Sequence, residues 1–399
     1  MMRFSPAPAL AAAFFLALTV TQPVRADFHS CVAGLATEAE AHGVPAQVAE
    51  AATANLTFNP DVLQAERSQP EFTTPIWDYI AALVDDERVA DGRAAIAKWG
   101  HWLNVAEQRY GVSGSVVAAI WGVESNFGQN FGNKPVLQSL ASLVCSNSIR
   151  PSYYHREFLA AMQIVGEGNA NPANFNGSWA GAFGNTQFMP STFLRLAVDL
   201  DGDGRRDVIN SVPDALGSTA NYLHRSGWIP GLPWGFEVKV PPGYPARDSW
   251  RASKQPLAAW AGRGFTHING APLSGEGAYG LLLPAGPRGP AFLVSRNFNA
   301  IFSYNAAESY ALAIALLSDR LRGHGPIVTP WPTDDPGLSR AGRREVQRLL
   351  IQHGYDIGGK IDAVLGHKTQ EAISDFQRRS GLKPTGRASQ SVLTALRSH

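Results

Sequence analysis

The chain has 399 residues, of which 45% are hydrophobic, and this length is enough for one large domain and a small one. The 34 Lys and Arg residues nearly balance the 33 Asp and Glu residues, giving a formal net charge of +1. This balance argues against nucleic acid as a partner. Beyond the N-terminus, no run approaches the roughly 18 consecutive apolar residues of a membrane helix, so we expect no membrane anchor.

Residues 1–26 have the pattern of a cleavable secretory signal peptide. Arg3 precedes an apolar stretch over residues 9–20, and Ala26 ends a segment whose small residues suit a signal peptidase. We therefore predict cleavage after Ala26 and export of the mature chain. The residues before Cys31 lack the small apolar lead-in of a lipid-modified cysteine, so a lipid anchor is not expected.

Cys31 and Cys145 are the only cysteines. In an exported chain such a pair can oxidise, and two thiols allow one internal bridge. In the chain-entropy model, closing so long a loop stabilises the fold by roughly 4–5 kcal/mol. The alternative is a pair of buried free thiols.

Residues 27–325 form the predicted main domain. They alternate apolar stretches of helical period with loops rich in Gly, Asn and Pro, and few segments alternate with the two-residue period of an exposed strand. We predict a mainly α domain with minor β structure. Residues 326–339 contain prolines and aspartates that interrupt a helix, which predicts a Pro-rich extended linker.

One acidic residue lies in an apolar helical segment of this domain. The segment SVVAAIWGVESNFG carries apolar residues at helical spacing, namely Val116, Ile120, Val123 and Phe127. Glu124 lies beside this stripe. Partial burial disfavours the ionised form of a carboxylate, which makes it a better proton donor near neutral pH, so Glu124 is a candidate general acid. The alternative is a helical glutamate that reaches solvent or pairs with a nearby base.

A second segment, NGSWAGAFGNTQFMPSTF, is rich in small polar residues and aromatic rings. Ser178, Asn185 and Gln187 can donate and accept the hydrogen bonds that sugar hydroxyl and acetamido groups require. Trp179 and Phe188 could stack on sugar rings. The composition therefore indicates a sugar-binding cleft, with a tight loop whose aromatic rings fill the core as the alternative.

Three motifs in order resemble one known family. Glu124 within VESNFG, Ser178 and Gln187 within GSWAGAFGNTQFMPS, and Tyr304 and Asn305 within IFSYNAAESYALAI are similar to the B-type lytic transglycosylases of glycoside hydrolase family 103. The resemblance covers nearly the whole main domain and implies a lysozyme-like fold. It further implies that Glu124 is the sole catalytic acid/base and that the other four residues line the glycan cleft.

The resemblance implies a reaction with peptidoglycan glycan strands in the periplasm. Ordinary glycosidases use two carboxyl groups, and the motifs contain no obvious second one. A lytic transglycosylase needs one, because the C6 hydroxyl of N-acetylmuramic acid attacks its own C1 and leaves a 1,6-anhydro end. The resemblance also places Arg150 near contacts to the stem peptide. The alternatives are a hydrolytic muramidase and a non-catalytic wall-binding scaffold.

The segment DLDGDGRRDVIN resembles an EF-hand calcium loop. Asp199, Asp201 and Asp203 fall at its first, third and fifth positions, but Asn210 stands where a bidentate Glu is expected. The family resemblance supports an ion here, with Asp214 supplying a carboxylate. The candidate ligands are Asp199, Asp201, Asp203, Arg205 and Asp214. Hard oxygen ligands suit structural Ca²⁺ or Na⁺, and no cofactor is expected for the chemistry. The alternative is an Asx-rich turn without an ion.

Residues 340–399 show three helical patterns, over 340–353, 368–380 and 389–397, which predict a compact three-helix bundle. The segment resembles the three-helix peptidoglycan-binding module. Without that resemblance, its apolar positions indicate only the core of a small bundle. A second wall-binding site would raise the local concentration of the enzyme on an insoluble polymer.

Overall fold

The computed structural model describes residues 23–67, 74–245, 247, 249–251 and 254–398. Most of the predicted signal peptide lies outside these ranges. Within them, none of the helices combines the length and apolar character that crossing a membrane requires.

The main domain is mostly helical, as the sequence predicts. Its helices are α1 (Pro23–Ala41), α2 (Ala46–Thr53), α3 (Asp61–Glu66), α5 (Ile76–Leu83), α6 (Asp86–Tyr110), α7 (Gly114–Ser125), α8 (Val136–Val144), α9 (Pro151–Gly166), α10 (Pro190–Leu196), α11 (Val212–Arg225), α12 (Leu257–Ala261), α13 (Arg296–Asn305) and α14 (Glu308–Leu321). The C-terminal module consists of α15 (Arg340–Gln352), α16 (His367–Arg379) and α17 (Gln390–Ser398), within a residue or two of the predicted helical patterns.

Two small antiparallel sheets supply the β structure. The strands are β1 (Lys134–Pro135), β2 (Asn176–Gly177), β3 (Gly235–Lys239), β4 (Gln255–Pro256), β5 (Thr266–His267), β6 (Ala278–Leu282) and β7 (Phe292–Val294). Strands β1 and β2 pair with each other, and the others form a five-stranded sheet in the order β4-β6-β7-β3-β5. Because β7 is buried at every position and β6 at all but its first, neither shows the alternation by which an exposed strand is recognised.

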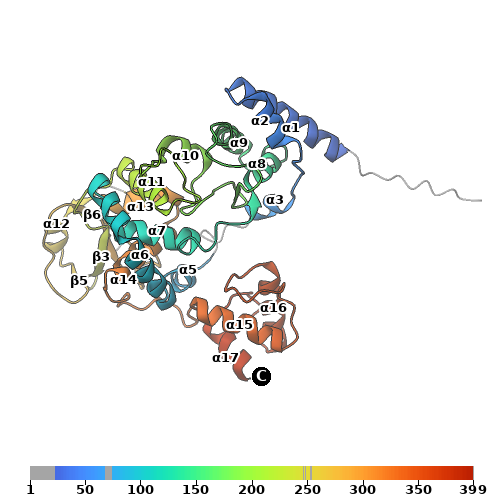
Figure 1. The fold of residues 1–399 in the computed structure, drawn as a ribbon. Helices are drawn as coiled ribbons and strands as arrows, with labels where there is room; N and C mark the ends of the chain where they lie inside the picture. Colours follow the sequence, from blue (N-terminus) through green and yellow to red (C-terminus); the bar gives the residue numbers. More distant parts are fainter. Residues whose placement is uncertain (1–22, 68–73, 246, 248, 252–253, 399) are drawn as a thin grey trace, which may run out of the picture.

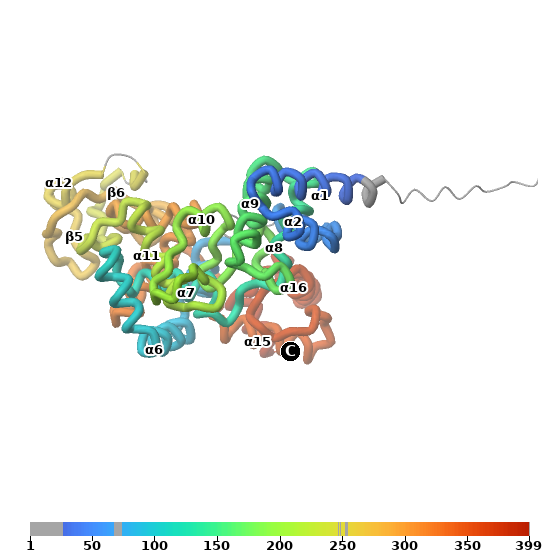
Figure 2. Tube along the Cα trace, turned by 45° about the horizontal axis from the view of Figure 1, so that its top comes forward, coloured from blue at the N-terminus to red at the C-terminus, as the bar shows by residue number. Residues whose placement is uncertain are grey.

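The main domain is elongated. In both views, the five-stranded sheet and α12 lie at one end and α1 and α2 at the other (Figures 1 and 2). Buried side chains form one core around α6, α7, α11 and α14, and a second around α1, α8, α9 and α10. A third core covers the sheet, and the C-terminal module has a core of its own.

Side chains at helix ends fix several of these elements. The Asp85 carboxylate accepts a hydrogen bond from the Arg88 backbone N–H at 2.8 Å and so caps α6. Ser211 caps α11 and Ser295 caps α13 in the same way. Helix α6 ends at Tyr110 and is capped by Gly111, whose φ of 71° is a conformation that glycine adopts without strain.

A disulfide joins Cys31 of α1 to Cys145, the residue that follows α8, with a Cα–Cα distance of 5.9 Å. This confirms the predicted bridge over the alternative of free thiols. The two cysteines are 114 positions apart in the sequence. In the chain-entropy model, closing a loop of this length stabilises the folded state by about 5 kcal/mol. The bridge ties the N-terminal helix to the second core.

The C-terminal module is docked on α5 and α6 through ion pairs. Arg340 lies 3.3 Å from Asp85 and 3.1 Å from Asp91. Arg387 approaches Asp78 to 2.7 Å, and both of its contacting nitrogens donate to that carboxylate. Asp78 and Asp85 are buried, so these pairs are shielded from solvent and more strongly coupled than surface pairs.

The segment between the two parts is also held in place. Ile327 and Trp331 pack against the first core, and the backbone N–H groups of Val328 and Thr329 donate to the Glu237 carboxylate at 2.8 Å. A linker of this composition predicts an extended chain, and nothing in its sequence predicts these contacts. The module is therefore fixed to the main domain by the segment as well as by its own arginines.

Candidate active site

Glu124 lies in the last turn of α7, where the helix ends abruptly. Asn126 and Phe127 both have left-handed backbone conformations, with φ of 50° and 57°, and the chain turns back on the helix. The Phe127 ring then covers Gly122, where an added Cβ would lie 2.4 Å from the ring. Glycine is therefore required at this position, and Glu124 stays partly exposed while most of α7 is buried.

Glu124 faces a pocket of about 260 Å³, which we call the Glu124 pocket. Its walls come from α5, α7, α13, α14 and the C-terminal module, through Thr74, Tyr79, Ala82, Leu83, Val123, Glu124, Asn305, Tyr310 and Arg343. Among these described residues, Glu124 is the single carboxylate. Asp78 lines the adjoining groove instead, and its carboxylate forms an ion pair with Arg387 at 2.7 Å.

Tyr310 of α14 orients the carboxyl group. Its hydroxyl donates a hydrogen bond to Glu124 Oε1 at 2.6 Å. Burial and the Glu124 charge hold the pKa of Tyr310 well above its usual value, so this tyrosine remains a protonated donor over the physiological range.

Tyr304 lies against Tyr310 with parallel rings whose centroids are 6.3 Å apart. Burial, and next the Glu124 carboxylate, raise the pKa of Tyr304 well above its usual value. Its hydroxyl donates to the Thr186 carbonyl oxygen at 2.8 Å. The structure thus places Tyr304 behind the pocket that Glu124 and Asn305 line, and Tyr304 connects this pocket to the polar loop.

The polar loop, residues 178–188, is fixed to the end of α7 by Asn185. Ser125 Oγ donates to the Asn185 carbonyl oxygen at 2.5 Å, and Trp121 Nε1 donates to Asn185 Oδ1 at 3.0 Å. The Asn185 amide donates to the carbonyls of Val208 and Ile209, and the residue is 2% exposed. Asn185 therefore supports the loop and is not a surface sugar contact, contrary to its expected role.

Ser178 and Gln187 stay partly exposed in this loop. Ser178 Oγ accepts from the Ala182 N–H at 3.1 Å, and the Gln187 amide donates to the Phe131 and Gly184 carbonyls at 3.1 and 3.0 Å. Neither residue lines the Glu124 pocket. Phe188 is 2% exposed and fills the second core, so the expectation that it stacks on sugar is wrong.

Arg150 lies apart from the pocket, at the start of α9. It is exposed, and its guanidinium lies over the rings of Tyr153 and Tyr154 at 5.0 and 5.7 Å. The structure therefore does not bring Arg150 into the pocket walls with Glu124.

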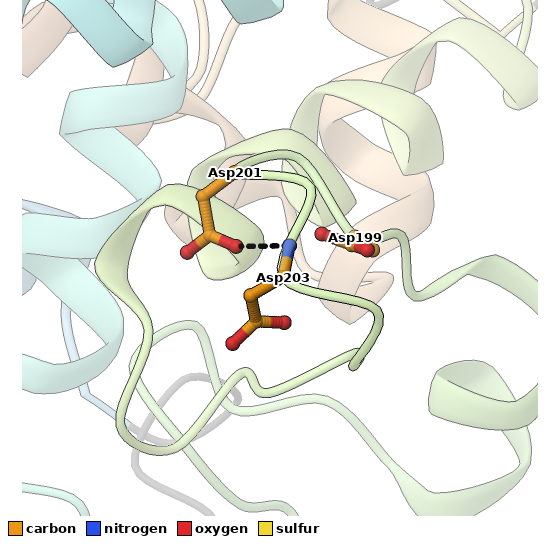
Figure 3. A group of neighbouring side chains, drawn as sticks. All are labelled: Asp199, Asp201 and Asp203. Atoms are coloured by element: carbon orange, nitrogen blue, oxygen red, sulfur yellow. Dashed lines mark hydrogen bonds between the residues drawn. The ribbon is translucent and has the colours of Figure 1, made fainter.

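The acidic loop between α10 and α11 brings three carboxylates together (Figure 3). One oxygen from each of Asp199, Asp201 and Asp203 lies within 4.8 Å of the others. Two oxygens on one calcium ion lie up to about 5 Å apart, so this spacing fits a hard cation. Loop N–H groups already position these side chains: Gly204 donates to Asp199 at 2.8 Å and Arg205 to Asp203 at 2.8 Å.

Asp214 lies beneath this loop and is fully buried. Its two oxygens accept from the backbone N–H groups of Leu200 and Asp207, both at 2.8 Å. Burial raises the pKa of Asp214, and these hydrogen bonds oppose the rise. Asp214 thus stabilises the loop through hydrogen bonds to its backbone and is not one of the three converging carboxylates.

Tyr310 and Arg343 are two of the pocket residues that the sequence motifs did not identify. Tyr310 lies in the quoted segment around Tyr304, but its own local pattern does not distinguish it from the other residues of α14. Arg343 comes from the C-terminal module, 219 positions from Glu124, and no local pattern could have placed it there.

A mainly helical domain, in which the described residues of one pocket include a single carboxylate, is joined to a three-helix module, and this combination defines the class of the protein. Residues 27–319 match the family described as "Transglycosylase SLT domain", and residues 339–396 match the "Putative peptidoglycan binding domain". The chain belongs to the SLT transglycosylase family and carries a C-terminal peptidoglycan-binding domain.

Individual relatives agree with this assignment. The chain is 29% identical over 259 residues to membrane-bound lytic murein transglycosylase B of Escherichia coli K12, covering 59% of this chain and 64% of that protein. The structure of SltB3 from Pseudomonas aeruginosa, in complex with NAG-anhNAM-pentapeptide, is similar at a TM-score of 0.74. It has 44% identity, covering 93% of this chain and 99% of that one. Escherichia coli Slt35, in complex with calcium, has a TM-score of 0.63 and 27% identity over 75% of this chain and 93% of its own.

Proposed function

We propose that this protein is a lytic transglycosylase of peptidoglycan. It cleaves the β-1,4 bond between N-acetylmuramic acid and N-acetylglucosamine without water and leaves 1,6-anhydromuramic acid ends. The observation that carries the proposal is the Glu124 pocket, whose described walls offer one carboxylate. A hydrolase of the ordinary two-carboxylate type would need a second one across the bond.

Glu124 acts twice in this reaction. Its carboxyl proton passes to the O4 oxygen of the departing N-acetylglucosamine as the bond from that oxygen to C1 breaks. The C6 hydroxyl of the muramic acid then bonds to C1, and its proton passes to the Glu124 carboxylate, which restores the acid. The attack is intramolecular, so holding the sugar with O6 facing C1 supplies much of the rate.

The residues around Glu124 support this role. The Tyr310 hydroxyl, which hydrogen bonds to Oε1 at 2.6 Å, holds the carboxyl group in one orientation for both proton transfers. Asn305 contributes a polar side chain to the same pocket. Tyr304, Ser178 and Gln187 line the glycan cleft on either side of Glu124. Arg150 contacts the stem peptide.

The acidic loop is proposed to bind structural Ca²⁺, or Na⁺ in its absence. The three converging carboxylates of Asp199, Asp201 and Asp203 support this assignment, and their mutual repulsion would be relieved by a cation. Arg205 and Asp214 complete the proposed ligand set, although Asp214 already accepts two backbone hydrogen bonds. The ion takes no part in the chemistry.

The proposed site of action is the periplasm, reached through the signal peptide predicted at residues 1–26. The module and the Glu124 pocket then meet the same partner, the glycan strands of the wall. No protein partner is proposed.

Product analysis tests the reaction. Purified mature protein is incubated with sacculi in oxygen-18 water, and the released muropeptides are analysed by mass spectrometry. We expect 1,6-anhydro ends without oxygen-18. Labelled reducing ends would establish the hydrolytic muramidase instead, and the absence of any released product would leave a wall-binding scaffold.

A further inference from the structure

The Glu124 pocket opens into a larger groove between the two parts of the protein. This interdomain groove has a volume of about 810 Å³ and shares Thr74, Ala82, Leu83 and Arg343 with the pocket. One wall is formed by α5 and the turn after α7. The other is formed by the C-terminal module, through α15, residues 362–365 and residues 385–388. The module therefore lines a space that is continuous with the reacting residue.

Three arginines of α15 line this groove, and two of them form ion pairs with acidic residues of the main domain. Arg340 is paired with Asp85 and Asp91, and Arg344 is paired with Glu87. Among the described residues, Arg343 forms no ion pair. Its Nη2 donates to the Asp78 backbone carbonyl at 3.2 Å, and its buried Nε has no hydrogen-bond partner in the described part of the chain.

A buried donor without a partner is costly, and a guanidinium that lies in a pocket wall without an ion pair can pair with an anionic ligand. Burial lowers the pKa of Arg343, and the Asp78 and Asp85 charges oppose this, so the guanidinium remains a cation. Its planar donor edge is suited to a carboxylate. Because the module is fixed by the Arg340 and Arg387 pairs, this donor is held in the pocket wall and not on a mobile tether.

We propose that Arg343, contributed by the C-terminal module, completes the Glu124 pocket and binds a carboxylate of the wall fragment held there. The module is then part of the substrate cleft as well as an anchor to the wall. This inference rests on the proposed function for the identity of the substrate. Wall strands offer two sources of the carboxylate, the stem peptides and, where a peptide has been removed, the lactyl group of muramic acid.

Arg343 is a positioning residue, and binding is the direct readout. In a Glu124→Gln background, which prevents turnover, the dissociation constants of purified strands are measured by calorimetry. Two forms of each strand are compared, one that carries its stem peptides and one from which an amidase has removed them. The variants are Arg343→Met, Arg343→Lys and the control Arg348→Met, which removes an exposed arginine of the same helix that lines neither cavity.

We expect Arg343→Met to weaken binding about 10- to 100-fold, the range for losing a hydrogen bond to a charged group. Arg343→Lys should recover part of the loss, and Arg348→Met should bind like the parent. A loss confined to peptide-bearing strands assigns the stem-peptide carboxylate, and a loss confined to amidase-treated strands assigns the lactyl carboxylate. Equal binding by Arg343→Met and Arg348→Met, or no recovery with Arg343→Lys, would overturn the proposal.

Two controls separate this outcome from others. Wild-type turnover of the same strands tests the proposed function independently, because the binding series does not depend on anhydro products. Thermal melting and tryptic digestion report whether the module stays docked. If Arg343→Met undocks, Arg343→Gln keeps a donor for the Asp78 carbonyl and is used in its place.

Discussion

Glu124 and its hydrogen-bond partner Tyr310 are 186 positions apart in the chain. The sequence could single out Glu124, because an acid beside an apolar helical stripe is unusual and the surrounding motif is specific. It could not supply Tyr310, since only the packing of α14 on α7 places that hydroxyl at the carboxylate. Motifs thus reveal the residue that carries the chemistry, and the folded chain reveals what orients it.

The first prediction at this scale concerns the proton transfers. Glu124→Gln should fold normally and lose at least about 10⁴-fold in kcat, because one group performs both transfers and each is typically worth 10²–10⁴-fold. The measurement is release of anhydromuropeptides from sacculi. The control is Glu276→Gln, which changes an exposed glutamate near the sheet and should leave kcat unaltered. Substantial turnover by Glu124→Gln would remove Glu124 from the mechanism.

A second prediction concerns Tyr310. Tyr310→Phe keeps the buried ring and removes only the donor to Glu124, so kcat should fall about 10- to 100-fold while KM changes little. The matched control is Tyr279→Phe, another buried tyrosine, whose hydroxyl donates to a backbone carbonyl at 3.3 Å far from the pocket. If both variants retain full kcat, the Tyr310 hydrogen bond has no part in catalysis.

At the scale of elements, helices were predicted more accurately than strands. The module's three helices begin and end close to the predicted positions, because apolar residues at helical spacing mark them. The strands are two to five residues long, and β7 is buried throughout. Short, fully buried strands carry no alternation, so the sequence predicts only that some β structure exists.

The acidic loop gives the prediction for this scale. Millimolar calcium should raise the melting temperature of the wild-type protein, because an ion bound to the native loop alone stabilises it. Replacing Asp199 and Asp203 together with Ala should abolish the response, since both belong to the converging cluster. Differential scanning fluorimetry with calcium and with chelator measures it.

The control for the loop is Asp86→Ala. Asp86 is an exposed acid paired with Arg320, and surface pairs of this kind contribute little to stability. This variant should respond to calcium like the wild type. Identical responses from the wild type, the loop variant and the control would show that calcium acts elsewhere.

At the scale of the whole molecule, the sequence separates the two parts by composition but does not predict how they are joined. The residues that dock them are ordinary surface types in the sequence, namely arginines of the module and aspartates of α5 and α6 or next to them. Only the structure shows that Asp85 both caps α6 and accepts from Arg340, whose backbone N–H lies 2.8 Å from its second oxygen. One residue therefore couples a helix end of the main domain to the first turn of the module.

The prediction for this scale is that the module undocks when Asp78 is removed. Asp78→Ala leaves the partly buried Arg387 with only its longer, 3.6 Å pair to Asp335, and losing one member of a buried pair costs up to about 3–5 kcal/mol. Undocking frees Arg340, the tryptic site at the start of α15, from its ion pairs, so cleavage between the two parts should become several-fold faster. Activity should also fall, because one wall of the interdomain groove is displaced. Gel analysis of timed digests gives the rate.

Two further variants distinguish docking from general destabilisation. Exchanging the charges, with Asp78→Arg and Arg387→Asp in one chain, should restore part of the protection by re-forming the pair in the opposite sense. Glu345→Ala breaks an exposed pair with Arg397 inside the module and should leave the digestion rate unchanged. If Asp78→Ala is digested no faster than Glu345→Ala, the buried pair does not hold the module. The interdomain groove would then depend on the packed segment around Trp331 instead, whose side chain lies against the first core.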